Sequence, residues 1–174
     1  YDKTTKTLSI INDFDFQKGI SNNITNIIVK NGAVARVFEN VTVYATNFFV
    51  ESGAFVDATG KGNQNGTGPG AGPYGSGSFY GGGGGGYGGA GGKGAYTVSN
   101  GIAYGDMFSP SDYGSGGGNS NSFVGGYGGG KIHIVATNVE INGTMHARGL
   151  PGSVGGNSVG GAGSGGTVLI DAGT

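Results

Sequence analysis

Glycine is concentrated in one block of the chain, residues 61–130, and this block limits what the chain can fold into. It holds 29 of the 44 glycines in the 174-residue sequence, six of them in succession at 81–86. Glycine loses more backbone freedom on ordering than any other residue, so neither a helix nor an ordinary strand is expected here. Two alternatives are left: a flexible linker, or extended glycine helices with three residues per turn that pack backbone against backbone.

Aromatic residues separate these two alternatives, because a flexible linker seldom carries many large rings. Ten tyrosines and phenylalanines punctuate the block: Tyr74, Phe79, Tyr80, Tyr87, Tyr96, Tyr104, Phe108, Tyr113, Phe123 and Tyr127. Only residues that lack a Cβ let extended backbones approach closely, as in collagen. We therefore predict an ordered glycine-rich layer of extended polyglycine-type helices.

The chain carries little charge. Charged residues make up 11% of it and the net charge is −1, so there is no electrostatic footprint for nucleic acid or an anionic membrane. Cysteine is absent, which excludes disulfides, thiolate metal sites and cysteine nucleophiles. No apolar run is long enough for membrane insertion. We expect no cofactor, no nucleic-acid partner and no membrane span.

The sequence on either side of the glycine block is typical of short β-strands. β-Branched and aromatic residues dominate them, turns at Lys18-Gly19 and Asn31-Gly32 separate the first ones, and helical spacing is missing, so an all-β fold with no α-helix is predicted. The expected strands are 7–11, 24–29, 33–38, 41–45, 48–50, 54–58, 132–136, 139–141, 144–147 and 167–172.

Parts of the strand pattern recur. Ala45-Thr46-Asn47 returns 91 residues later as Ala136-Thr137-Asn138, and residues 130–136 resemble residues 166–172 at a spacing of 36. Recurring strands with excursions of variable length favour a parallel β-solenoid, whereas an antiparallel β-sandwich does not require the same turn to recur. We predict strand rungs at 1–60, a glycine- and aromatic-rich insertion at 61–130 that packs on the solenoid, and second and third repeat rungs with a short glycine-rich excursion at 131–174, all in one folded unit.

One stretch resembles a known kind of module. It runs from Ile102-Ala103-Tyr104-Gly105-Asp106 through Pro110 to Gly114-Ser115-Gly116-Gly117-Gly118, and Gly128-Gly129-Gly130-Lys131-Ile132 follows. It is similar to a glycine-rich repeat module of large secreted or surface proteins of protists, plants and some bacteria. The resemblance covers roughly residues 41–174, and it departs from that pattern in having tyrosine in the polyglycine run where histidine is common. It implies a β-helical, extracellular, non-catalytic building block.

Four Asn-x-Ser/Thr sequons are present, and none has proline in the middle position, so each is a competent acceptor for N-linked glycan in a secreted protein. The short motif also arises by chance in a chain rich in Asn and Thr. Glycans would supply solubility that the few charges do not. We predict occupancy at two or more of the four acceptors, Asn23, Asn40, Asn65 and Asn142.

Catalytic and metal sites are not expected. The lysine of Gly91-Gly92-Lys93-Gly94 has no hydroxyl residue after it, so the run is not a phosphate-binding loop. Asp106 is the weak candidate for a calcium ligand, and its expected role is to accept hydrogen bonds from nearby backbone N–H groups. His133 and His146 are expected to be outward-facing polar positions on strands. We predict that the chain is not an enzyme.

The remaining expectation is a structural protein at the cell surface or outside the cell. The last strand is followed by no capping sequence, so copies of the chain are expected to stack end to end into a fibre, appendage or matrix. An adhesin tip on a phage or bacterial surface and a carbohydrate- or ice-binding module are the alternatives. Four tyrosines are the candidates for contact with a partner or a glycan: Tyr74, Tyr80, Tyr87 and Tyr127.

Overall fold

The computed structural model has an all-β fold, as predicted, and contains no α-helix in the part of the chain that it describes. It describes residues 1–17, 24–38, 41–76, 81–95, 99–121 and 123–173. The chain forms two compact units, each assembled from separate stretches. Unit 1 consists of Tyr1–Asp57, Ile132–His146 and Val168–Thr174, and unit 2 consists of Ala58–Lys131 and Ala147–Thr167. The glycine block at 61–130 thus falls in unit 2, together with residues 147–167.

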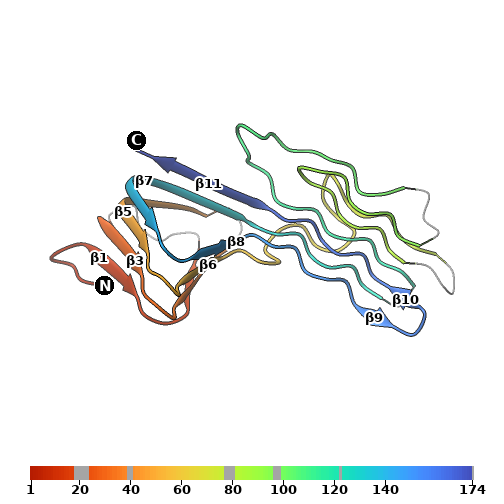
Figure 1. Cartoon of the computed structure of the whole chain (residues 1–174), viewed down its shortest axis with the longest axis horizontal. Coiled ribbons are helices and arrows are strands. Elements are labelled where there is room, and N and C mark those ends of the chain that lie inside the picture. The colour runs from red at the N-terminus through yellow and green to blue at the C-terminus, as the bar shows by residue number, and fades with distance from the viewer. Residues whose placement is uncertain (18–23, 39–40, 77–80, 96–98, 122, 174) are drawn as a thin grey trace. The chain divides into compact units, whose positions relative to one another are not determined.

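Five strands form the larger sheet (Figure 1). Its order is β1 (Thr7–Ile10), β3 (Asn26–Val29), β5 (Thr42–Val50), β7 (Lys131–Ile141) and β11 (Thr167–Ala172). The pairs from β1 to β7 are parallel. β11 continues the same direction, because the N–H of Thr167 donates to Gly130 O and that of Gly173 to Ala136 O, each at 3.0 Å.

The first strands with even numbers form a second parallel sheet. Its order is β2 (Phe14–Phe16), β4 (Val34–Val37), β6 (Phe55–Asp57) and β8 (Thr144–His146). Parallel neighbours cannot be joined by a tight hairpin and need a crossover. From β1 to β8 each crossover contains a strand of the other sheet, so each of these passes adds one strand to each sheet, whereas β11 adds a strand to the larger sheet alone.

Alternation along the strands builds the core of unit 1. In β3, Ile27 and Val29 are buried while Asn26 and Ile28 are half-buried. The register places apolar residues of successive strands side by side, so that Ile10, Val29 and Val50 form one buried column. Burying each such aliphatic side chain contributes about 1.5–3 kcal/mol.

A glycine turn carries the chain from one sheet to the other. Gly32 has φ +80° and Gly53 has φ +78°, a left-handed conformation that glycine adopts without a steric penalty. The N–H of Gly32 donates to Gly53 O at 3.1 Å, so the turns of successive passes lie against each other. The predicted Asn31-Gly32 turn is confirmed, and the predicted Lys18-Gly19 turn lies outside the described residues.

The 91-residue repeat is a structural one. β5 and β7 pair in register, with Ala45 beside Ala136 and Asn47 beside Asn138. The amides of this column bond to one another: Asn138 Nδ2 donates to Asn47 Oδ1 at 2.8 Å, and Asn47 Nδ2 donates to Asn26 Oδ1 at 2.6 Å. Asn26 Nδ2 in turn donates to Thr7 Oγ1 at 3.0 Å, so a polar ladder crosses four strands.

Unit 2 is held together by hydrogen bonds between extended glycine-rich segments. The six successive N–H groups of residues 81–86 donate in rotation to three neighbouring segments, at 92–95, 159–162 and 70–73. The acceptor oxygens are, in order, those of Ala95, Val159, Pro73, Gly92, Ala162 and Gly70, at 3.4, 2.9, 2.9, 2.8, 2.9 and 2.8 Å. Each neighbour therefore receives a bond from every third residue.

These segments pack so closely that a side chain has no room. A Cβ built on Gly161 would lie 1.9 Å from Gly83 O, and one on Gly118 would lie 1.9 Å from Pro73 O. Gly88 and Gly92, in contrast, have nothing within 4 Å of that position. Unit 2 also contains one short antiparallel hairpin, of β9 (Val154–Gly155) and β10 (Ser158–Val159).

Candidate functional site

The inner side of β11 is open to solvent. The backbone bonds that join β11 to β7 place Val168 beside Ile132 and Ile170 beside Ile134. Ile132 and Ile134 are 0% exposed, whereas Val168 is 43% and Ile170 is 36% exposed. The difference arises because β7 has a neighbour on each side, while β11 is the edge strand of the sheet.

The same change of exposure occurs in the other columns of unit 1. Val139 and Ile141 follow Phe48 and Val50 in register, and Met145 follows Val56. The three earlier residues are buried, and the later ones are only half-buried. The apolar core of unit 1 therefore reaches the surface at its last pass. We call this region the end surface; it consists of Val139, Ile141, Met145, Val168 and Ile170.

The opposite end of unit 1, at β1 and β2, is better covered. Ile10 and Phe16 are 2% and 1% exposed, and the rings of Phe14 and Phe16 meet edge to face at 5.2 Å. On the outer edge of β1, Asp2 and Thr7 exchange two backbone hydrogen bonds of 2.9 and 3.0 Å. The two ends therefore differ: one is closed by aromatic rings and an edge contact, and the other exposes aliphatic side chains.

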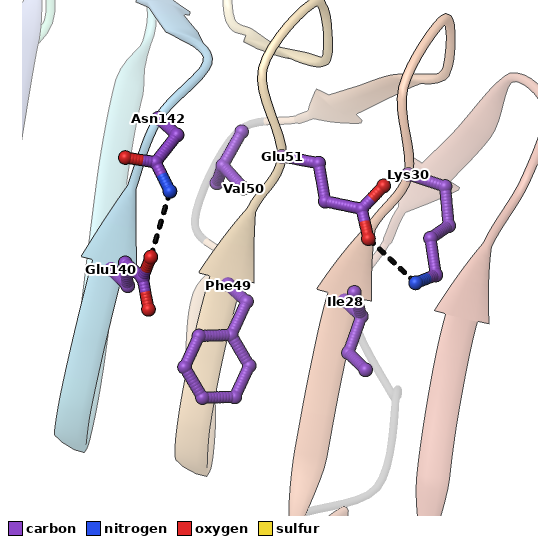
Figure 2. A pocket seen from close by; sticks show the side chains of 7 residues that line it. All are labelled: Ile28, Lys30, Phe49, Val50, Glu51, Glu140 and Asn142. Atoms are coloured by element: carbon purple, nitrogen blue, oxygen red, sulfur yellow. Dashed lines mark hydrogen bonds and ion pairs between the residues drawn. The ribbon is translucent and has the colours of Figure 1, made fainter.

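A groove lies on the outer face of the larger sheet of unit 1 (Figure 2). Its volume is about 250 Å³, and we call it the Phe49 groove; its lining consists of Ile28, Lys30, Phe49, Val50, Glu51, Glu140 and Asn142. Register places the ring of Phe49 between Ile28 and Glu140. The groove thus combines an aromatic floor with a charged rim.

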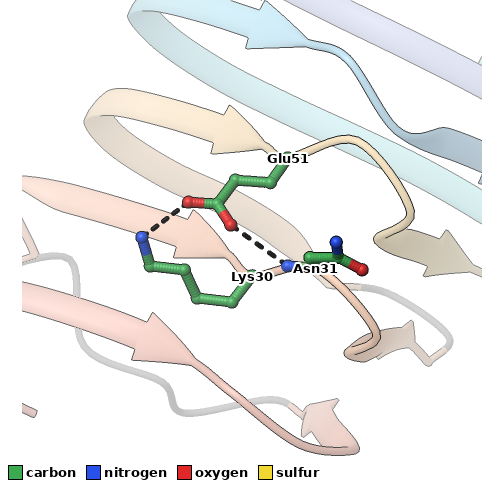
Figure 3. Close-up of polar contacts among 3 residues, drawn as sticks. All are labelled: Lys30, Asn31 and Glu51. Atoms are coloured by element: carbon green, nitrogen blue, oxygen red, sulfur yellow. Dashed lines mark hydrogen bonds and ion pairs between the residues drawn. The ribbon is translucent and has the colours of Figure 1, made fainter.

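Hydrogen bonds fix the rim of the Phe49 groove. Lys30 Nζ lies 2.6 Å from Glu51 Oε1, and the Asn31 N–H donates to Glu51 Oε2 at 3.1 Å (Figure 3). The Lys30 bond, followed by the Asn31 bond, lowers the pKa of Glu51. Asn142 Nδ2 donates to Glu140 Oε1 at 2.7 Å. At neutral pH the rim therefore carries an ionised Glu51.

The four sequons differ in their settings. Asn142 and Thr144 are both exposed. Asn65 is half-buried, and its Nδ2 donates to Asn119 Oδ1 at 2.9 Å. Asn23 and Asn40 lie outside the described residues. Occupancy at two or more of the four stays a prediction, and Asn142 offers the more accessible amide of the two that can be compared.

The predicted contact tyrosines also have different settings. Tyr74 and Tyr127 are exposed. Tyr87 is half-buried, and its hydroxyl lies 2.5 Å from Thr167 Oγ1 and donates to Asp112 O at 3.2 Å. Tyr80 lies outside the described residues. The hydroxyl of Tyr87 is thus engaged within unit 2, and only its ring is left for an outside contact.

Sequence reasoning did not single out the most exposed apolar residues of unit 2, Met107 and Phe108, which are 83% and 90% exposed. They follow Asp106, whose Oδ1 accepts the N–H groups of Phe108 and Ser109 at 2.7 and 2.9 Å. These bonds lower the pKa of Asp106, that from Ser109 most. A groove of about 430 Å³, the loop groove, adjoins this turn; its lining consists of Tyr87, Gly88, Ala103, Tyr104, Gly105, Asp106, Met107 and Pro110.

The buried hydroxyl of Ser115 bonds to Tyr104, which lines the loop groove. Ser115 is fully buried; its Oγ donates to Tyr104 Oη at 2.9 Å and accepts the N–H of Gly70 at 2.9 Å. Tyr104 Oη donates to the carbonyl oxygen of Tyr113, and burial of the ring raises the pKa of Tyr104. Ser115 thus joins three separate segments of unit 2.

Replacing Ser115 with alanine is expected to destabilise unit 2 by about 1–3 kcal/mol, because the buried Gly70 N–H loses its acceptor. Thermal unfolding of S115A against the parent protein measures the loss. S153A is the matched control, because the Ser153 hydroxyl accepts the N–H of Val124 at an exposed site. An equal loss in both variants would show that burial of the Ser115 contact has no special effect.

His133 joins three strands. Its Nδ1 lies 3.2 Å from Thr42 Oγ1, and its Nε2 lies 2.8 Å from Asp171 Oδ2. The order hydroxyl, imidazole, carboxylate is that of a hydrolase triad, but acyl transfer also needs oxyanion donors near the hydroxyl. Neither the Phe49 groove nor the loop groove includes these residues. We interpret these three side chains as a structural hydrogen-bonded link between β5, β7 and β11.

The other predicted histidine, His146, has its ring 5.8 Å from that of Phe55. Within the described ranges, no group of three or more His, Cys, Asp or Glu side chains is placed to hold a metal ion. Nor does any helix there have the length and apolar character needed to cross a membrane.

Comparisons of the chain with protein-family models, with curated proteins and with solved structures find no match.

Proposed function

We propose that the chain is an extracellular structural subunit that stacks end to end with copies of itself into a fibre or matrix. The observation that carries this proposal is the end surface of unit 1. Its aliphatic side chains continue buried columns, yet Val168 and Ile170 are more than one-third exposed. An exposed strand edge beside an exposed apolar face is the usual starting point for addition of another strand.

The architecture that we infer is a parallel β-solenoid in unit 1 and a layer of polyglycine-type helices in unit 2. Two parallel sheets whose strands alternate along the chain support the solenoid. Donation to each neighbour from every third residue of 81–86 supports helices with three residues per turn. Both are repetitive scaffolds, which suits a building block.

A head-to-tail contact continues the existing register. If β1 of a second copy follows residues 138–141 of the first, Thr7 of that copy comes beside Asn138 and extends the amide ladder, as it already does beside Asn26. The backbone of Asp2 is hydrogen-bonded to Thr7 on the outer edge of β1, and these two bonds must break before this edge can pair with another copy. We therefore expect the first copy to add more slowly than it would without this conformational change.

A heterologous contact of this kind generates open fibres, whereas two end surfaces that face each other across a two-fold axis would give a closed dimer. The resemblance to modules of secreted and surface proteins supports an extracellular setting. The exposed Asn142 sequon supports a glycoprotein.

Electron microscopy of the purified chain tests the proposal. We expect fibres with an axial rise of about 19 Å per copy, because each copy adds four strand layers, β1, β3, β5 and β7, at about 4.8 Å each. Isolated monomers or closed dimers at high protein concentration would contradict end-to-end stacking.

A second candidate function is adhesion through the loop groove. Met107 and Phe108 project from a turn that Asp106 fixes, beside a groove of about 430 Å³. Large exposed apolar side chains on a fixed turn are common in binding surfaces. Single copies at the tip of a larger assembly in the micrographs would favour adhesion over stacking.

A further inference from the structure

The Phe49 groove and the Asn142 sequon occupy the same outer face of unit 1. Lys30, Glu51 and Asn142 each follow residues that pair in register, Val29, Val50 and Ile141. In Figure 2 the amide of Asn142 points along β7 toward Glu140, and register places Phe49 beside Glu140 on the next strand. The nitrogen that would carry an N-linked glycan is therefore at the rim of the groove.

Modification of this nitrogen is compatible with the contact that it makes. Asn142 Nδ2 keeps one hydrogen after glycosylation, and that hydrogen can still be donated to Glu140 Oε1, which now lies 2.7 Å away. Retaining this bond would hold the amide in its present direction. The first sugar would then extend over the row that contains Phe49 and not away from the sheet.

The lining of the groove suits an N-acetylhexosamine. The apolar face of a pyranose ring stacks on an aromatic ring, and Phe49 supplies one, with Ile28 beside it. Sugar hydroxyls and the acetamido N–H donate to carboxylates, which Glu51 and Glu140 supply, and Lys30 can donate to the acetamido oxygen. The volume of about 250 Å³ is below the ~300–1,000 Å³ of sites for drug-sized ligands, so it suits one sugar ring.

We propose that the Phe49 groove is the docking site of the glycan attached to Asn142, with its first N-acetylhexosamine stacked on Phe49. This inference rests on the proposed glycosylation and not on the proposed stacking. Its consequence is that the glycan ties the last pass of the chain, which carries Asn142, to the preceding strand, which carries Phe49. Docking therefore stabilises the rung next to the end surface.

The test compares glycosylated and bare protein from a secretory host. Thr144→Ala removes the sequon without touching Asn142, and Thr144→Ser keeps it. We expect the glycan to raise the midpoint of thermal unfolding of the Thr144→Ser protein by about 2–4 °C over Thr144→Ala. In a Phe49→Leu background, which keeps an apolar side chain but removes the ring, the difference between the two proteins should fall below about 1 °C.

Tyr44→Leu is the matched control, because Tyr44 is an exposed aromatic residue of the same strand outside the groove, and it should leave the full glycan effect in place. An undiminished effect in the Phe49→Leu protein, with Asn142 occupied, overturns the docking proposal while glycosylation stands. Mass spectrometry that finds Asn142 bare in the Thr144→Ser protein overturns both the docking and the glycosylation at this site. Neither result alters the fibre measurement.

Discussion

The double variant Val168→Asp, Ile170→Asp is expected to abolish fibre formation while the monomer stays folded. Both side chains belong to the end surface, on which the next copy would stack, and both are exposed in the single chain. Burying two unpaired carboxylates removes the apolar contact and adds a desolvation cost of at least about 3 kcal/mol. That cost corresponds to an increase of at least about 100-fold in the concentration needed for assembly. Sedimentation and electron microscopy across a concentration series measure it.

The matched control is Val154→Asp with Ile102→Asp, which replaces the same residue types and adds the same charge. Val154 and Ile102 are 75% and 64% exposed and belong to unit 2. This control should assemble at the same concentration as the parent protein. Equal loss of assembly in the two double variants would mean that added charge, and not the end surface, causes the effect. Unfolding curves confirm that each monomer is folded.

Much of unit 1 could be predicted because its repeats contain register information. The spacing of 91 residues that aligns Asn47 with Asn138 also aligns Thr42 with His133, and the two side chains do meet. The spacing of 36 likewise places Asp171 beside Val135, which lies two residues from His133 on the same strand, and Asp171 does contact His133. In a parallel stack, a repeat in the sequence is a lateral neighbour in space.

The exposure of the end surface could not be predicted from residue type. Val168 and Ile170 have the same alternation as Ile132 and Ile134, and only the order of strands in the sheet distinguishes an edge from an interior position. Residue type also did not predict that residues 147–167 belong to the same compact unit as the glycine block. Apart from the Ser164 hydroxyl, which bonds to the backbone of Ser115, the hydrogen bonds that join them to 81–86 and 114–118 run from backbone to backbone, and such bonds leave little pattern in the side chains.

The same backbone contacts underlie the largest stability effect that we expect, that of Gly161→Ala. Gly161 is buried, donates to Gly118 O and accepts the N–H of Gly126, each at 2.8 Å. A methyl group there would lie 1.9 Å from Gly83 O and 2.5 Å from Gly83 C, atoms of a backbone that is itself hydrogen-bonded. Segments must separate by about 1 Å, and we expect a loss of at least about 3 kcal/mol, or a fall of about 6–12 °C in the unfolding midpoint.

Gly92→Ala is the control that makes this prediction specific to close packing. Gly92 belongs to the same layer, since its carbonyl oxygen accepts the N–H of Gly84 at 2.8 Å, but nothing lies within 4 Å of the position of its Cβ. At such a site alanine restricts the unfolded chain and should stabilise the fold by about 0.4–1 kcal/mol. The two substitutions therefore have opposite signs if the layer is ordered. If residues 81–92 were a flexible linker, both would have effects near zero, and hydrogen exchange would show no protection of the amides at 81–86.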